Sequence, residues 1–168
     1  MKAIEASVEM LQEEFDVNAT KEQLVEKVYE EIERAGRLCY KSEDKIGDGT
    51  AKAFVDMLMN AGHNAMLEHG TVYLYDTYDV SATDSWGASI GPKYKNNKYS
   101  VVNVDNGMDI RGIYITTNYR VLVENNWLDD LQYIHIPEDF HEPRITVKFV
   151  CDRGISHELV RHKQLCVA

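Results

Sequence analysis

Residues 50–75 read TAKAFVDMLMNAGHNAMLEHGTVYLY and combine a helix pattern, a helix stop and a strand pattern. Apolar residues recur at helical spacing at the start of this stretch, which predicts a helix from Thr50 to Ala61. The stripe consists of Ala51, Phe54, Val55 and Leu58. Gly62 is expected to end this helix, because glycine adopts the left-handed cap conformation without steric cost. A strand is predicted over Gly70–Tyr75, where β-branched and aromatic residues alternate.

A second helix is predicted upstream of this stretch. Thr20 and Gln23 match a capping box, in which each side chain bonds to a free backbone N–H of the other residue. An apolar stripe follows at helical spacing, and Gly36 is expected to end the helix. The pattern of residues 1–17 fits either a short strand or a helix.

The polar segment 76–111 is expected to be a long, mobile surface insertion, because it has few aliphatic residues. After it we predict a short strand at Ile113–Ile115, a helix over Asn118–Leu131 and a linker between Pro137 and Pro143.

Residues Arg144–Cys151 alternate between apolar and polar side chains, which predicts a strand with one buried face. A turn and a helix over Ile155–His162 are expected to follow. Together the patterns predict an α/β (α+β) fold, in which helices pack on a mainly antiparallel sheet. We expect a single domain over residues 1–168.

Acidic residues outnumber basic ones by 28 to 18, which gives a net charge of −10. This charge argues against nucleic acid and anionic membranes as partners. The sequence has no apolar run of about 18 residues and no signal-like N-terminus. Its three cysteines are widely spaced, so no disulfide framework is expected. These features predict a cytoplasmic protein.

The final helix pattern presents chemically useful side chains. Glu158, Arg161 and His162 share one helix face, and Lys163 follows directly. This face is open to two interpretations: a solvated face with an internal ion pair, or a site for phosphate or carboxylate groups. The pair His157-Glu158 does not make a zinc-protease motif, because position 161 is arginine where a second histidine is needed. We therefore expect no metal site.

Two other segments are ambiguous when taken alone. His63, Glu68 and His69 lie between a helix stop and a strand, where they could form a site or cap the ends of elements. The segment Arg37-Leu38-Cys39-Tyr40-Lys41-Ser42 could hold a phosphate through free N–H groups, or form a loop with Cys39 and Tyr40 facing inward.

In their order along the chain, residues 37–42, 63–69 and 153–163 resemble successive blocks of the flavin-dependent thymidylate synthases. Thr116-Thr117-Asn118-Tyr119-Arg120 fits longer members of that family. The resemblance implies methylation of dUMP to dTMP, with methylenetetrahydrofolate as carbon donor, NADPH as reductant and FAD as hydride carrier. It also implies a homotetramer with FAD at the subunit interfaces.

The resemblance also implies roles for single residues. His63 would line the flavin and act in catalysis, and Glu68 and His69 match the pair that follows this histidine. Arg161, His162 and Lys163 would contact FAD. Arg161 would also act in catalysis and, with Glu158, bind dUMP.

Three positions depart from the family pattern: Lys163 replaces an arginine, Ala65 a hydroxyl residue and Cys166 a serine. The chain resembles only the N-terminal part of such an enzyme, so an incomplete version is expected. The first alternative is a non-catalytic nucleotide-binding or FAD-binding remnant, or a partner subunit. A more distant one is a metal hydrolase built on His63, His69 and His157.

Overall fold

The protein was analysed as a computed structural model that describes residues 5–11 and 14–159. The chain divides into two compact units. The larger one is Phe15–Pro143, and the smaller one combines Met1–Glu14 with Arg144–Ala168. Helices and antiparallel sheets build the described part, so the predicted α+β class is confirmed.

The larger unit contains a three-stranded antiparallel sheet in the order β2-β4-β3 and a set of helices. Its strands are β2 (Thr71–Asp79), β3 (Val101–Val104) and β4 (Ile110–Asn118). Its α-helices are α1 (Lys21–Cys39), α2 (Thr50–Asn60), α3 (Ser85–Ala88), α4 (Gly91–Lys95) and α5 (Tyr119–Asn125). Three 3₁₀ helices join them: η1 (Glu43–Lys45), η2 (Asn64–His69) and η3 (Leu128–Tyr133).

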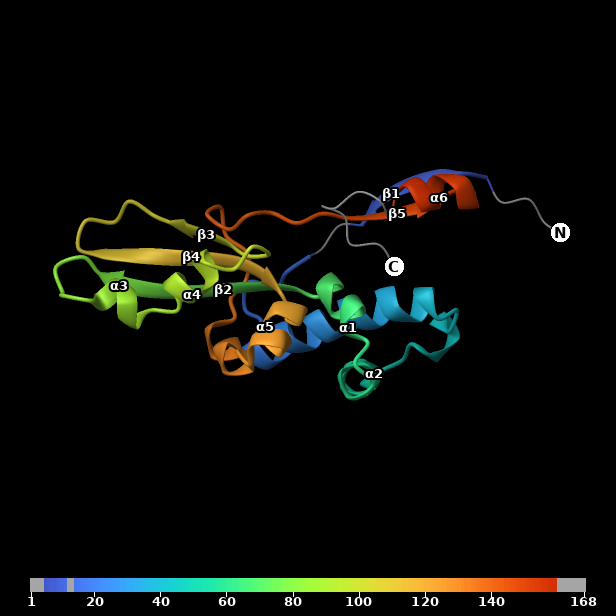
Figure 1. Ribbon diagram of the computed structural model, residues 1–168, viewed down its shortest axis with the longest axis horizontal. Coiled ribbons are helices and arrows are strands. Elements are labelled where there is room, and N and C mark those ends of the chain that lie inside the picture. Colours follow the sequence, from blue (N-terminus) through green and yellow to red (C-terminus); the bar gives the residue numbers. More distant parts are fainter. Residues whose placement is uncertain (1–4, 12–13, 160–168) are drawn as a thin grey trace. The chain divides into compact units, whose positions relative to one another are not determined.

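The core of the larger unit lies between the sheet and the helices. Val72 and Leu74 of β2 lie beside Thr117 and Ile115 of β4, and all four side chains are fully buried. Helices α1, α2 and α5 gather at the end of the sheet where β2 begins and β4 ends (Figure 1). The candidate segment 63–69 lies at this end, because η2 leads directly into β2.

The opposite face of the sheet is aromatic. Tyr73 and Tyr75 of β2 and Tyr114 of β4 lie on this face, and Phe140 stacks on Tyr114 with ring centroids 5.0 Å apart. His141 is buried and fixes the covering loop, because its Nε2 atom lies 3.1 Å from the carbonyl oxygen of Leu74. Its Nδ1 atom accepts the N–H of Glu138 at 3.0 Å.

Helix α1 begins as predicted and ends later than predicted. Thr20 and Gln23 form both halves of the capping box. The expected stop at Gly36 is wrong, because the helix continues to Cys39. Gly36 is buried against helix α2, and a Cβ atom there would lie 2.6 Å from the ring of Phe54. Its role is close helix packing, which the local sequence pattern does not reveal.

Helix α2 confirms the prediction for Thr50–Ala61, and Gly62 has the expected left-handed conformation with a φ of 70°. Strand β2 begins at Thr71, one residue after the predicted start, and extends four residues beyond the predicted end, to Asp79. The alternation of Val72 and Leu74 with tyrosines thus sets which face of the sheet the helices cover.

Residues 76–111, for which we predicted a surface insertion, contain regular secondary structure. They contain the end of β2, helices α3 and α4, strand β3 and the start of β4. Tyr94 is fully buried and donates a hydrogen bond to Asp130 at 2.7 Å, and Lys93 pairs with the same carboxylate at 2.6 Å. The segment has few aliphatic residues, and it packs on the rest of the unit through the buried side chain of Tyr94 and the pairing of β3 with β4.

The predicted helix over Asn118–Leu131 is divided into α5 and η3. Asn118 caps α5 by accepting the N–H of Val121 at 3.1 Å. Asn126 then adopts a left-handed conformation with a φ of 58°, which ends the helix. Asparagine tolerates this conformation better than most residues, so the break has a local cause.

The smaller unit pairs β1 (Ser7–Leu11) with β5 (Thr146–Val150) in an antiparallel two-stranded sheet, followed by α6 (Arg153–Leu159). The strand alternative for the first residues is therefore the observed one. The prediction that one face of β5 is buried is wrong, since the side chains of Val147 and Phe149 on that face are 37% and 46% exposed. The expected helix over Ile155–His162 is described only as far as Leu159.

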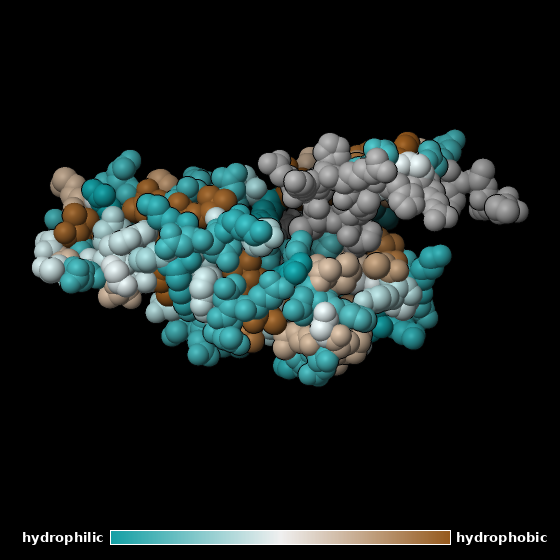
Figure 2. Space-filling view, viewed as in Figure 1, coloured by the Kyte–Doolittle hydropathy of each residue, from teal (hydrophilic) through white to brown (hydrophobic). Residues whose placement is uncertain are grey.

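Hydrophilic side chains spread over the visible face of the larger unit, and hydrophobic ones form scattered patches between them (Figure 2). None of the helices in the described part of the chain has the length and apolar character that a membrane span requires.

Candidate functional site

The end of α1 is closed by backbone hydrogen bonds. Lys41 adopts a left-handed conformation with a φ of 51°, and its N–H donates to the carbonyl of Leu38 at 3.2 Å. The N–H of Ser42 donates to the carbonyl of Arg37 at 2.9 Å. This Schellman arrangement satisfies the last carbonyls of the helix and leaves Tyr40 as its cap residue.

Neither interpretation of residues 37–42 is correct. The N–H groups of Lys41 and Ser42 bond to helix carbonyls, so they are not free to cradle a phosphate. A helix C-terminus also carries partial negative charge, which disfavours an anion. Cys39 and Tyr40 do not face inward, because both are exposed.

Helix α2 ends with the same arrangement. Gly62 takes the left-handed position, and the N–H of His63 donates to the carbonyl of Leu58 at 2.9 Å. The two helix ends lie close enough for their next side chains to meet. The hydroxyl of Tyr40 lies 3.0 Å from Nδ1 of His63, and the ring centroids are 6.3 Å apart.

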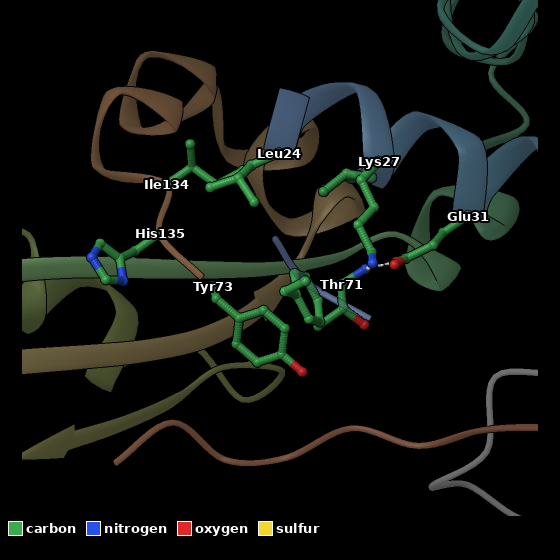
Figure 3. Close-up of a pocket in the computed structure, with 9 residues that line it drawn as sticks. Leu24, Lys27, Glu31, Thr71, Tyr73, Ile134 and His135 are labelled. Atoms are coloured by element: carbon green, nitrogen blue, oxygen red, sulfur yellow. Dashed lines mark hydrogen bonds between the residues drawn. The ribbon is translucent and has the colours of Figure 1, made fainter. Parts of the chain in front are cut away.

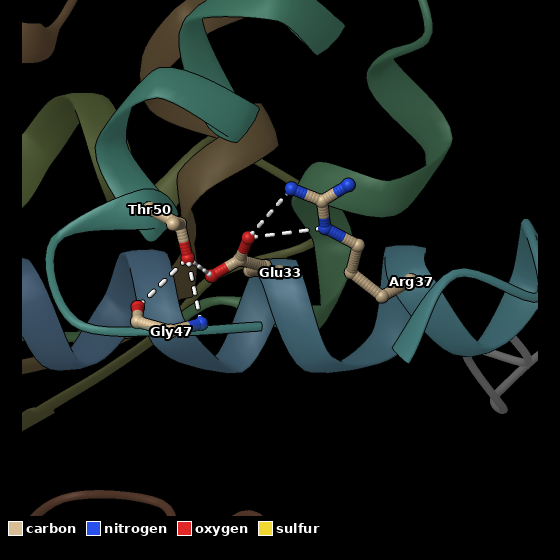
Figure 4. Close-up of polar contacts among 4 residues, drawn as sticks. All are labelled: Glu33, Arg37, Gly47 and Thr50. Atoms are coloured by element: carbon tan, nitrogen blue, oxygen red, sulfur yellow. Dashed lines mark hydrogen bonds and ion pairs between the residues drawn. The ribbon is translucent and has the colours of Figure 1, made fainter. Parts of the chain in front are cut away.

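A buried carboxylate fixes the helices behind this pair (Figure 4). Glu33 is 2% exposed and accepts hydrogen bonds from Arg37 at 3.0 and 3.1 Å and from the hydroxyl of Thr50 at 2.9 Å. Arg37 also lies over the ring of Phe54, 4.5 Å from its centroid. This network joins the C-terminal turns of α1 to the first residue of α2.

Glu68 is held by an arginine of another element. It forms an ion pair with Arg120 of α5, which also pairs with Glu124 at 2.6 Å. The spacing of Arg120 and Glu124 is readable in the sequence as an i, i+4 pair, but the partnership with Glu68 spans 52 residues. In this structure Glu68 therefore ties η2 to α5, and the role implied for it toward FAD stays a prediction.

The candidate residues near the end of the sequence belong to the smaller unit. Glu158 lies on α6 and is exposed. Arg161, His162 and Lys163 lie outside the described residues. The structure thus brings together His63 with Tyr40, and Glu68 with Arg120. The implied contacts of Glu158 and of the segment 161–163 stay predictions.

A shallow pocket of about 220 Å³, including space open to solvent, lies elsewhere on the larger unit (Figure 3). Glu31 of α1 points into it and accepts the N–H of Thr71 at 3.3 Å. The other lining residues are Phe15, Leu24, Lys27, Val28, Tyr73, Ile134 and His135. None of the candidate residues in the described part of the chain lines this pocket.

Among the side chains that the structure describes, which do not include that of His157, no three of histidine, cysteine, aspartate or glutamate lie close enough together to hold a metal ion. His63 and His69 accordingly form no such group with other described residues.

Comparison with known proteins gives one partial similarity. A segment of 46 residues is 46% identical to the flavin-dependent thymidylate synthase of Corynebacterium aurimucosum. The segment is 26% of this chain and spans 18% of that protein. No protein-family model matches the chain, and no solved structure matches it. The chain is therefore similar, over about a quarter of its length, to a flavin-dependent thymidylate synthase.

Proposed function

We propose that this protein binds FAD and dUMP and takes part in flavin-dependent synthesis of dTMP. The observation that carries the proposal is the 46-residue similarity to a flavin-dependent thymidylate synthase. The structure adds support, because two segments that resemble blocks of that family meet at the Tyr40–His63 pair.

The chemistry of these side chains fits a flavin. Tyr40 is 45% exposed and His63 is exposed, so an aromatic ring and an imidazole are available to a ligand. Aromatic rings stack on flat ring systems, and imidazole can hydrogen-bond to their heteroatoms. Bound FAD would supply the transfer of a hydride from NADPH to the methylene group received from methylenetetrahydrofolate.

The remaining roles are part of the same proposal. Arg161, His162 and Lys163 would bind FAD, with cationic groups suited to its phosphates. Glu158 and Arg161 would bind dUMP. A homotetramer would complete the site. We also propose a cytoplasmic location, since the exposed free thiol of Cys39 is compatible with a reducing compartment.

A second candidate is a nucleotide-binding or FAD-binding protein without turnover. Two observations favour it: Ala65 has no hydroxyl for FAD, and Glu68 is already paired with Arg120. A partner subunit of the active enzyme would share these properties.

The deciding experiment is a titration of the purified chain with FAD, followed by flavin fluorescence, in the presence and absence of dUMP. We expect saturable binding that tightens with dUMP. His63→Gln should weaken it, whereas Lys52→Ala, at an exposed position of α2, should not. An absence of binding by a folded chain contradicts the proposal.

Turnover distinguishes the two candidates. Formation of dTMP from dUMP, methylenetetrahydrofolate and NADPH would support the enzyme. Binding of FAD without dTMP formation would favour the second candidate.

A further inference from the structure

We infer that Tyr40 is a positioning residue that keeps Nε2 of His63 protonated and available as a hydrogen-bond donor to the ligand. The inference concerns a contact that neither the sequence pattern nor the similarity indicates. Its ligand part rests on the proposed function, whereas its structural part does not.

Either group could donate in this contact, and we assign the donor role to the phenol. A neutral imidazole carries a proton on only one nitrogen, and a tyrosine hydroxyl can donate or accept. The hydroxyl of Tyr40 lies 3.0 Å from Nδ1 of His63. When the phenol donates to Nδ1, the imidazole proton resides on Nε2.

The same contact tolerates protonation of the ring. In the imidazolium form both nitrogens carry protons, so Nδ1–H donates to the oxygen of Tyr40. The hydroxyl reverses its role without movement of either side chain. Nε2 therefore presents an N–H in both protonation states, and it suits only a ligand atom that accepts a hydrogen bond.

Nε2 is available for such a ligand. His63 is exposed, and Nε2 has no hydrogen-bond partner among the residues that the structure describes. The fitting ligand groups are carbonyl oxygens and unprotonated ring nitrogens. A flavin ring carries both.

Tyr40 is itself well supported. Its ring packs edge-on against Phe54, with centroids 6.4 Å apart, and Phe54 is 4% exposed. Its backbone is fixed by the cap of α1, and its N–H donates to the carbonyl of Gly36 at 2.9 Å. The hydroxyl is thus presented from a packed helix end, so it can restrain the orientation of the exposed imidazole.

The test measures the imidazole directly. Long-range ¹H–¹⁵N spectra of the full chain distinguish a protonated nitrogen from an unprotonated one, and His63→Gln identifies the His63 signals. We expect the wild-type protein to carry the neutral-ring proton on Nε2. In Tyr40→Phe the Nδ1 signal should shift toward that of an unrestrained imidazole.

The matched control is Tyr29→Phe, which removes another hydrogen-bonded tyrosine hydroxyl, from within α1. That hydroxyl lies 3.4 Å from the hydroxyl of Tyr119 and does not contact His63. The control should leave the His63 signals unchanged. Tyr40→Phe keeps the ring that packs on Phe54, so its thermal unfolding should resemble that of the wild type.

Two results overturn the inference. One is a wild-type spectrum with the neutral-ring proton on Nδ1, which needs no variant. The other is an identical Nδ1 signal in wild type and Tyr40→Phe.

FAD affinity supplies the second readout. Loss of one oriented hydrogen bond should weaken FAD binding roughly 2- to 10-fold in Tyr40→Phe. Unchanged affinity, with a shifted Nδ1 signal, would overturn the ligand part alone. Absence of FAD binding in the wild type would contradict the proposed function, and the spectra would still decide whether Tyr40 holds His63.

Discussion

At the scale of single residues, the stability of the helix pair depends on Glu33. We expect Glu33→Ala to lower the free energy of unfolding by roughly 2–4 kcal/mol, because it leaves Arg37 without its buried acceptor. The side chain of Arg37 is only 16% exposed, so water replaces the lost contacts poorly. Urea unfolding followed by circular dichroism measures the change.

The chain offers a matched control for this prediction. Lys52 and Asp56 form an ion pair at the same i, i+4 spacing on α2, but their side chains are 62% and 47% exposed. Asp56→Ala should have a far smaller effect, since exposed pairs contribute little. Equal losses of stability in the two variants would show that burial of Glu33 is not what matters.

His141 should make the stability of the protein depend on pH. Burial lowers its pKa below the ordinary value of 6.5, although the hydrogen bond to the carbonyl of Leu74 raises it. Below about pH 6.5 the unfolded chain therefore binds a proton that the folded chain resists. The contribution of neutral His141 to stability is complete above that pH and decreases as the pH falls.

Urea unfolding of wild type and His141→Gln between about pH 7.5 and 5.5 isolates this contribution. The wild type should be the more stable protein at the upper pH, because the imidazole makes two hydrogen bonds. The difference between the two proteins should shrink toward the lower pH. A constant difference would contradict the assigned shift.

At the scale of elements, the crossing of α1 and α2 depends on Gly36. A Cβ atom there would lie 2.6 Å from the ring of Phe54, which is itself buried. Gly36→Ala should therefore destabilise the protein by roughly 1–3 kcal/mol, despite the better helix propensity of alanine. Thermal unfolding measures the loss.

Gly87→Ala is the control for this substitution. It lies in α3, where a Cβ atom would meet nothing within 4 Å. This variant should be neutral or slightly stabilising, because alanine reduces the freedom of the unfolded chain. If both variants were neutral, the close approach at Gly36 would not limit the packing of the two helices.

The same elements show what the sequence alone can predict. The cap of α1 and the stripe of α2 were predictable, since both depend on residues within a few positions of each other. The actual end of α1 was not predictable, because Gly36 packs against Phe54, which lies 18 positions away in the sequence. The regular elements within residues 76–111 were not predicted for a similar reason, because Tyr94 is held by Asp130, which lies 36 positions further along the chain.

The candidate site divides along similar lines. His63 and the segment that holds Tyr40 were both singled out from the sequence, but the contact between the two side chains requires two helix ends to converge. The partner of Glu68 was also unpredictable, because Arg120 lies on α5, 52 positions further along the chain. The sequence therefore indicates which residues could form a site, but it does not indicate the contacts that decide what those residues can do.

At the scale of the whole molecule, the two units differ in how much structure each can stabilise. The larger unit buries a continuous core between its sheet and helices, including Ile32, Leu58 and Leu74. The described part of the smaller unit has one two-stranded sheet and one helix of seven residues. A two-stranded sheet is marginally stable by itself in water.

Hydrogen exchange on the full chain should therefore separate the units. Amides of β2 and β4 should exchange only with global unfolding, whereas those of β1 and β5 should exchange through local opening. Strand β5 makes the comparison sharp, because among the described strands it pairs only with β1, whereas β4 is flanked by two strands. Val8 and Met10 of β1 are 69% and 61% exposed, so little apolar burial opposes that opening. Equal protection of β4 and β5 would mean that the smaller unit gains stability from contacts beyond its own sheet.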